Sequence, residues 1–338
     1  MNLIKLGWND DYLKDIDREG YKIARVAIKY RDIYKVYSEE GEILAETTGK
    51  MRYNEAFPAV GDWVLVSINE GDERAIIHSI LPRKSKVSRK VAGNTTYEQV
   101  VASNLDTIFI VSSLNQDFNL RRIERYLTIV WESGANPVIV LSKADLCPDV
   151  DSKIMEVEGV AFGVPVHPIS SLTDEGIGDL SQYLQEGETV ALIGSSGVGK
   201  STLVNKLIGE ERLKVQDIRE DDDKGKHTTT HRELIPLKEG GVIIDTPGMR
   251  EIQLWDGGEG LKDTFGDIEE LASRCHFNDC NHDSEPKCAV KRAIEEGELP
   301  QERLKSYRKL QRELEYIELK KKYGSEGASR IKLKRMGL

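Results

Sequence analysis

The segment 194–201 constrains the fold more than any other part of the chain. It reads Gly-Ser-Ser-Gly-Val-Gly-Lys-Ser and fits Gly-x4-Gly-Lys-[Ser/Thr], the pattern of a phosphate-binding loop. The apolar run 190–193 predicts a buried strand before it, and 202–208 predicts a helix after it that ends at Gly209. In such a loop, backbone N–H groups surround phosphate oxygens, a lysine adds positive charge and a hydroxyl binds Mg²⁺. The expected nucleotide contacts are Gly194, Ser195, Ser196, Gly197, Val198, Gly199, Lys200, Ser201 and Thr202.

Charge and cysteine content narrow the class of protein. The 338 residues suffice for two or three domains, and the formal net charge is -10. The charge is uneven, because 83–90 and 320–335 are basic whereas 220–223 is acidic. No apolar run approaches the roughly 20 residues of a membrane span, so no membrane association is expected. Three of the 4 cysteines cluster near His282, which indicates metal binding in a reducing cytoplasm rather than disulfides.

Turn signals divide the beginning of the chain into short segments. Residues 1–18 mix charges with aromatic side chains and receive no assignment. The predicted strands that follow are short and number five in about sixty residues, which fits a small closed barrel such as the OB-fold. They lie at 22–29, 33–37, 42–47, 62–68 and 74–80. We expect the barrel to occupy 1–82 and a basic linker to occupy 83–99.

From residue 100 the pattern changes to alternating strands and helices. Strands are predicted at 107–111, 137–141 and 164–169, and helices at 120–133 and 175–184. This alternation predicts a doubly wound parallel α/β sheet over 100–262. Ligands bind such sheets beyond the carboxyl ends of the strands, and the motifs below fall there.

A guanine pocket is indicated at the ends of two of these strands. Ser142-Lys143-Ala144-Asp145 resembles the Asn-Lys-x-Asp signature of GTPases, with serine in place of the usual asparagine. One carboxylate at Asp145 can accept from both N1–H and the NH₂ group of guanine, whereas adenine has an acceptor at N1. The Lys143 stem would cover the base. A backbone N–H of Ser170-Ser171 would bond the guanine O6.

Residues that sense the third phosphate follow the phosphate loop. The strand 242–245 ends in Asp-x-x-Gly, so Asp245 would reach Mg²⁺ through water and the Gly248 N–H would contact the γ-phosphate. The polar stretch 217–232 resembles a switch segment, in which Thr229 is our choice for the Mg²⁺ hydroxyl and Thr228 and Thr230 are alternatives. Because the guanine motifs precede the phosphate loop, the domain is predicted to be circularly permuted.

A metal cluster is predicted beyond this domain. Cys275, Cys280, His282 and Cys288 offer three thiolates and one imidazole within fourteen residues, a set that suits a structural tetrahedral Zn²⁺. Helices are predicted at 290–296 and 302–323, followed by a flexible basic tail over 324–338. We therefore expect a helical zinc-binding domain with a basic tail at 263–338.

The order of these parts resembles the ribosome small subunit-dependent GTPase A family. Gly-Lys-His-Thr-Thr-Thr at 225–230 and Asp-Thr-Pro-Gly at 245–248 carry the resemblance, together with the barrel and the cysteine spacing. It implies a cytoplasmic, monomeric GTPase that binds GTP, GDP and the maturing small ribosomal subunit with its rRNA. There it would act as a late assembly checkpoint, with hydrolysis stimulated by the subunit and needed for release, and with the barrel and zinc module as rRNA contacts.

The resemblance also concerns catalysis. Met249 stands where Ras-like enzymes carry a water-orienting glutamine, so the isolated protein should be slow. The catalytic candidates are His227, Lys200 and Thr229, although His227 could equally be a solvent-exposed loop residue. Two other functions remain open: a regulatory GTP-binding module acting on mRNA or tRNA, and a phosphate-loop kinase that uses ATP.

Overall fold

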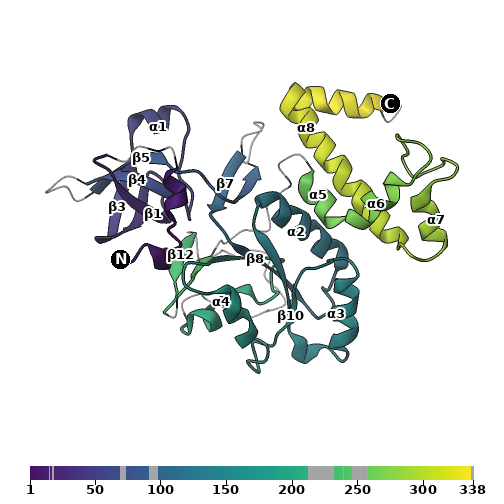
Figure 1. Cartoon of the computed structure of the whole chain (residues 1–338), viewed down its shortest axis with the longest axis horizontal. Helices are drawn as coiled ribbons and strands as arrows, with labels where there is room; N and C mark the ends of the chain where they lie inside the picture. The colour runs from purple at the N-terminus through teal and green to yellow at the C-terminus, as the bar shows by residue number, and fades with distance from the viewer. Residues whose placement is uncertain are drawn as a thin grey trace, which may run out of the picture.

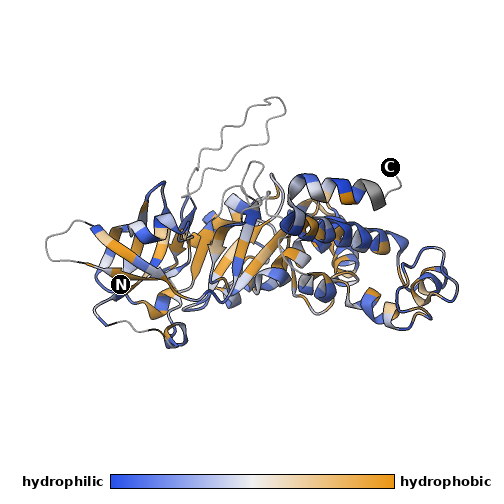
Figure 2. Cartoon of the chain, turned by 90° about the horizontal axis from the view of Figure 1, so that it is seen from above, coloured by the Kyte–Doolittle hydropathy of each residue, from blue (hydrophilic) through white to orange (hydrophobic). Residues whose placement is uncertain are grey.

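The molecule is elongated, with a barrel, a central sheet and a group of helices arranged in a row (Figure 1; Figure 2). The computed structural model describes residues 1–14, 16, 19–68, 74–90, 98–211, 232–238, 240–245, 254 and 258–335. Within these residues, no helix is both long and apolar enough to cross a membrane. Apolar residues concentrate along the strands, whereas the long C-terminal helix is largely hydrophilic (Figure 2).

Five strands close into the predicted barrel. They are β1 (Lys22–Lys29), β2 (Ile33–Ser38), β3 (Gly41–Thr47), β4 (Trp63–Ser67) and β5 (Arg74–Ile80). Their order is β1-β2-β3-β5-β4, and β4 pairs back onto β1, so the barrel has no open edge. A short helix, α1 (Gly49–Tyr53), lies between β3 and β4. The arrangement fits the OB-fold and confirms the barrel prediction.

The unassigned N-terminal residues fix the barrel to the central sheet. Two 3₁₀ helices, η1 (Ile4–Leu6) and η2 (Asp10–Leu13), bury Leu6 and Tyr12, and Trp8 packs edge-on against Trp63 of the barrel. Beneath them Arg25 is 1% exposed and donates to the backbone oxygens of Leu6, Gly61 and Asn104 and to Thr189 Oγ1. Burial lowers the pKa of Arg25 to about 10, so this guanidinium stays charged at neutral pH and bonds to four segments of the chain.

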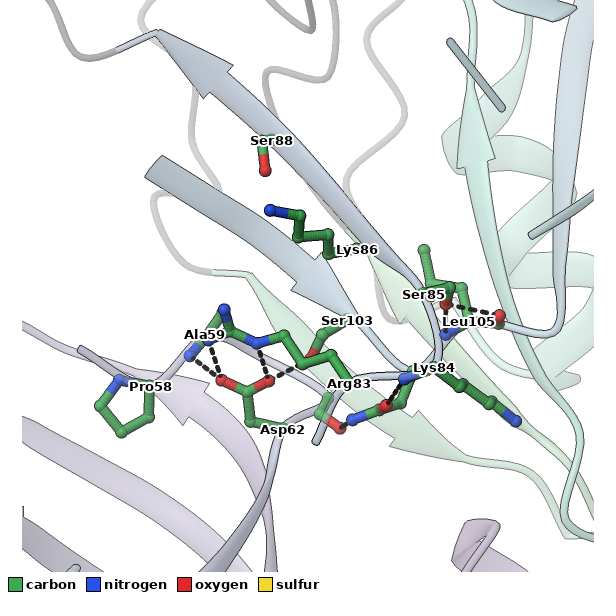
Figure 3. Close-up of polar contacts among 12 residues, drawn as sticks. Pro58, Ala59, Asp62, Arg83, Lys84, Ser85, Lys86, Ser88, Ser103 and Leu105 are labelled. Carbon is green, nitrogen blue, oxygen red and sulfur yellow. Dashed lines mark hydrogen bonds and ion pairs between the residues drawn. The ribbon is translucent and has the colours of Figure 1, made fainter. Parts of the chain in front are cut away.

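The stretch expected as a basic linker contains the first strand of a β-hairpin. β6 (Lys86–Lys90) pairs antiparallel with β7 (Glu98–Ser103). Several of its cations are already neutralised, because Lys84 and Lys86 pair with Asp106 and Glu98. Arg83 donates two hydrogen bonds of 2.6 Å to the fully buried Asp62, and Ser103 Oγ donates to the same carboxylate (Figure 3). These carboxylates offset part of the positive charge that the sequence places at 83–90.

The central sheet has one antiparallel strand among parallel ones. Its order is β10-β9-β8-β11-β13-β12, where β12 alone among these six runs antiparallel. Its strands are β8 (Thr107–Ser113), β9 (Asn136–Ser142), β10 (Val166–Pro168), β11 (Thr189–Ile193), β12 (Glu233–Pro236) and β13 (Val242–Asp245). β12 also meets β1 at Ile28 and Glu233, so the sheet continues into the barrel.

Helices cover both faces of this sheet. They are α2 (Leu120–Ser133), α3 (Val150–Glu158) and α4 (Lys200–Ile208), with 3₁₀ turns η3 (Ala144–Leu146) and η4 (Gly178–Tyr183). α2 has the predicted bounds because Asn119 Oδ1 accepts from the Arg122 N–H and Gly134 takes a positive φ of 82°. The helix predicted at 175–184 is wrong: Asp174 and Gly176 take positive φ, and only the 3₁₀ helix η4 follows.

The C-terminal part is helical. It contains α5 (Glu259–Thr264), α6 (Gly266–Ser273), α7 (Ala289–Glu295) and α8 (Gln301–Arg335), which kinks at Gly324 where φ is 71°. Beyond the kink the chain was expected to be flexible, yet it stays helical to Arg335. Ala328 is buried there and the Tyr316 hydroxyl lies 3.3 Å from Ser329 Oγ, so this segment packs against the first part of α8.

Candidate nucleotide site and metal centre

The phosphate loop connects β11 to α4, as the sequence predicts. Gly194 takes φ 147°, and a Cβ atom at this position would lie 2.3 Å from the Val111 oxygen. Only glycine fits that approach. Gly197 and Gly199 also have positive φ, which turns the loop into the helix. Lys200 Nζ donates to the backbone oxygens of Gly194, at 2.9 Å, and Ser195, so its ammonium lies over the loop.

The two predicted guanine segments meet at the neighbouring strand ends. Lys143 takes a left-handed φ of 60° after β9, which exposes Asp145 on η3. The buried Ser170 hydroxyl donates to Asp145 Oδ1 at 2.6 Å, and the Ala144 N–H donates to the Ile169 oxygen at 3.0 Å. The structure therefore brings Asp145 and Ser170 together from motifs 25 residues apart. Ser171 follows, half-buried.

Ser142 joins the guanine segment to the phosphate loop. Its hydroxyl donates to the Val198 oxygen at 2.6 Å, and the residue is 4% exposed. Asparagine, the usual residue of the GTPase signature at this position, often braces the phosphate loop. In this chain the shorter side chain still reaches the loop.

Only part of the magnesium and γ-phosphate machinery can be described. Asp245 ends β13, half-buried, and β13 pairs with the phosphate-loop strand β11. Ser201 begins the exposed side of α4. The predicted residues His227, Thr228, Thr229, Thr230, Gly248 and Met249 lie outside the described residues.

The four predicted metal ligands converge. The ligand atoms of Cys275, Cys280, His282 and Cys288 all lie within 4.8 Å of one another. Cys275 Sγ is 3.8 Å from Cys288 Sγ, and His282 Nδ1 is 3.6 and 3.4 Å from these sulfurs. A tetrahedral ion with bonds of about 2.3 Å to sulfur and about 2.0 Å to nitrogen requires separations of roughly 3.8 and 3.5 Å. The donor set and its spacing therefore fit zinc.

Sequence reasoning missed the residues that hold His282 in place. His282 has a left-handed φ of 59°, and both carboxylate oxygens of Glu285 accept from the backbone N–H groups of Asn281 and Asp283 on either side of it. The backbone N–H of Glu285 itself, followed by those of Asn281 and Asp283, lowers the pKa of Glu285 to about 2. Burial lowers the pKa of His282, and the nearby Arg308 lowers it further, which favours the neutral imidazole that a metal requires. The sequence signal that could have indicated this role is Glu285 itself, an acidic residue three positions after His282.

Similarity to known proteins extends over nearly the whole chain. A family model described as RsgA GTPase matches residues 80–255. The small ribosomal subunit biogenesis GTPase RsgA 2 of Lactiplantibacillus plantarum is 51% identical over 321 residues, which cover 94% of this chain and 90% of that protein. The chain belongs to the RsgA GTPase family.

Further relatives and solved structures agree with this assignment. RsgA 1 of Oceanobacillus iheyensis is 48% identical over 345 residues, covering 100% of this chain and 98% of the relative. The structure of YjeQ from Thermotoga maritima superposes with a TM-score of 0.67 at 30% identity, covering 87% of this chain and 98% of YjeQ. YloQ, described as a circularly permuted GTPase, gives 0.63 at 26% identity, covering 88% and 96%.

RsgA membership excludes one of the two alternative functions. The chain is a GTPase, so the interpretation as an ATP-using kinase is wrong. The permutation is visible in the sheet, because the phosphate-loop strand β11 lies between β8 and β13 but follows the guanine strands β9 and β10 along the chain.

Proposed function

We propose that this RsgA GTPase is a late-stage assembly factor of the small ribosomal subunit, whose hydrolysis of GTP is stimulated by the subunit and coupled to release. The names of its relatives support this role. The observation that carries the proposal is the arrangement of a permuted GTPase sheet between a closed barrel and a Cys₃His cluster. One nucleotide site thereby adjoins two parts that can contact RNA.

Guanine recognition rests on Asp145. Its carboxylate accepts from the N1–H and NH₂ groups of the base, and the hydrogen bond from Ser170 fixes the orientation of that carboxylate. Lys143 covers one face of the base and the Ser171 N–H bonds O6. Ser142 holds this segment in register with the phosphate loop.

Phosphate binding rests on the loop and on Lys200. The lysine releases the oxygens of Gly194 and Ser195 and contacts the β- and γ-phosphates, while loop N–H groups surround them. Ser201, Thr229 and, through water, Asp245 would hold the Mg²⁺ that neutralises charge as the γ-phosphate leaves. The Gly248 N–H would contact the γ-phosphate.

Slow hydrolysis by the isolated protein follows from Met249. A thioether cannot orient an attacking water, and His227 is the candidate to do so on the subunit. Replacing His227 by alanine should then reduce subunit-stimulated turnover while nucleotide affinity changes little.

RNA contact is assigned to the two outer parts. We propose the barrel at 1–82, the linker at 83–99, the GTPase domain at 100–262 and the zinc-binding domain with its basic C-terminal end at 263–338. The zinc ion would have four protein ligands and a structural role, since no position is left for water. Such a factor would work in the cytoplasm as a monomer.

GTP turnover with and without purified small subunits tests this function. Stimulation is expected with small subunits and not with large subunits, mRNA or tRNA. Co-sedimentation should show tighter binding with a non-hydrolysable GTP analogue than with GDP, and weaker binding as salt rises. Stimulation by mRNA or tRNA alone would favour the regulatory-module alternative, and equal binding in both nucleotide states would contradict the coupling to release.

A further inference from the structure

Helix α2 lies between the phosphate loop and the C-terminal helices (Figure 1). On one side, Ile123 and Tyr126 border a narrow gap whose other wall includes Ser195 and Val198 of the phosphate loop. On the other side, Glu124 and Arg125 make ion pairs with α8. A single helix therefore borders the nucleotide site and makes ion pairs with the part of the chain that carries the Cys₃His cluster.

A buried arginine of α8 makes the first of these connections. Arg303 is 1% exposed, and it donates to Glu124 Oε1 at 2.9 Å and to both Asp267 oxygens at 2.7 and 2.8 Å. It also donates to the backbone oxygens of Thr264 and Val160, and its guanidinium lies 4.9 Å from the Phe265 ring. One side chain thus ties α2, α5, α6 and the end of α3 to α8.

The carboxylate of Glu124, on α2, would lose a cationic partner if α2 and α8 separated. Glu124 is fully buried, and its Oε1 accepts from both Arg303 and Arg121. Within the described part of the chain, Oε2 has no hydrogen-bond partner. Separation of a buried carboxylate from its cation is strongly unfavourable, so α2 and α8 are expected to move together rather than apart.

A second ion pair prevents α8 from pivoting about the first. Arg125 donates to both oxygens of Glu313 at 2.6 and 2.7 Å, and both side chains are about one-third exposed. Glu313 and Arg303 are ten residues apart on α8, or roughly 15 Å along the helix. A helix held at two such points follows the movements of α2 as a rigid body.

We propose that α2 is a rigid connection through which the phosphate loop sets the position of α8 and the Cys₃His module, with Glu124–Arg303 and Arg125–Glu313 as its positioning contacts. Only one consequence of this connection, the nucleotide-dependent binding of small subunits, rests on the proposed function. The connection itself concerns two parts of one chain. It adds a second route beside the direct continuation of the chain from β13 into the C-terminal helices.

A charge-swap cycle at the partly exposed Arg125–Glu313 pair tests the connection without changing the buried Glu124–Arg303 pair. The variants are Arg125→Glu, Glu313→Arg and the double swap, compared in the full chain with GDP and with a non-hydrolysable GTP analogue. Hydrogen exchange followed by mass spectrometry measures protection in 194–201, 275–288 and 301–323. In the wild type, the exchange rates of the two C-terminal segments should differ between nucleotides by about fivefold or more.

In each single swap this difference should disappear from the C-terminal segments but persist at the phosphate loop, and the double swap should restore it. Glu124→Gln, which keeps an acceptor for Arg303, should reduce the difference without unfolding the protein. Swapping the ion pair Lys153–Glu156 on α3, which has similar exposure, is the matched control and should change nothing.

Two results would overturn the proposal: C-terminal exchange that does not respond to nucleotide in the wild type, or a nucleotide response that survives both single swaps. Small-subunit binding is measured separately. If the exchange cycle behaves as expected but no subunit binds, then the proposed function fails and the connection stands.

Discussion

Replacing Ser142 by alanine removes a buried hydrogen bond between the guanine segment and the phosphate loop. The donor is 4% exposed, and Val198, whose oxygen accepts the bond at 2.6 Å, is 2% exposed. Leaving a buried acceptor without its donor costs about 1–3 kcal/mol. If the whole cost falls on the loop geometry that nucleotide requires, the Kd should rise by roughly 5- to 150-fold. The bond is separate from the γ-phosphate contacts, so the affinities for GDP and GTP should fall by the same factor.

Two variants make the measurement specific. Ser142→Thr keeps the hydroxyl and should bind nearly as well as the wild type, whereas Ser171→Ala keeps the backbone N–H proposed for guanine and should be neutral. Fluorescent GDP and GTP analogues titrated against each protein, with thermal unfolding to confirm the fold, give the comparison. Equal Kd values for Ser142→Ala and Ser142→Thr would refute the reasoning, since the hydroxyl would then contribute nothing.

Three further predictions concern separate parts of the site. Cys280→Ser should lose the one zinc per chain measured by elemental analysis and loosen 270–290 in limited proteolysis, because metal binding and local folding are coupled; full zinc content would exclude Cys280 as a ligand. Asp145→Asn should shift preference from GTP toward xanthosine triphosphate in competition titrations, and equal affinity of the wild type for ATP and GTP would contradict the guanine pocket. Gly194→Ala should abolish nucleotide binding measured by calorimetry, since its Cβ would lie 2.3 Å from the Val111 oxygen. Gly197→Ala, with positive φ but no atom within 4 Å of its Cβ, should lose far less.

Local signals predicted local structure well. The capping Asn119 and the final Gly134 gave the bounds of α2, and the phosphate loop follows a buried strand as its pattern requires. The Cys₃His set was found for the same reason, because its four ligands lie within fourteen residues and share one chemistry. Asp145 and Ser170 could be paired because each follows a strand in a parallel sheet.

Contacts between distant segments could not be predicted. Arg25 and Arg303 look like ordinary surface arginines in the sequence, yet each is buried among acceptors supplied by several elements. The N-terminal 3₁₀ helices likewise gain their order from Trp63 and from the junction they cover. The ion pairs of the basic run after the barrel could not be predicted for the same reason, since Arg83 and Lys84 pair with Asp62 and Asp106, about twenty residues away on either side.

The strand order of the central sheet determines when each strand can pair with its neighbours during synthesis. β8 pairs with β9 as soon as both have emerged, but its other neighbour, β11, begins at Thr189, about 75 residues after β8 ends at Ser113. At roughly 5–20 residues per second, the second edge of this apolar strand stays open for several seconds. An open apolar edge is a template for pairing with other chains. The nascent protein therefore has an aggregation-prone strand edge, of the kind that chaperones protect, while residues 114–188 are being made and before the phosphate loop exists.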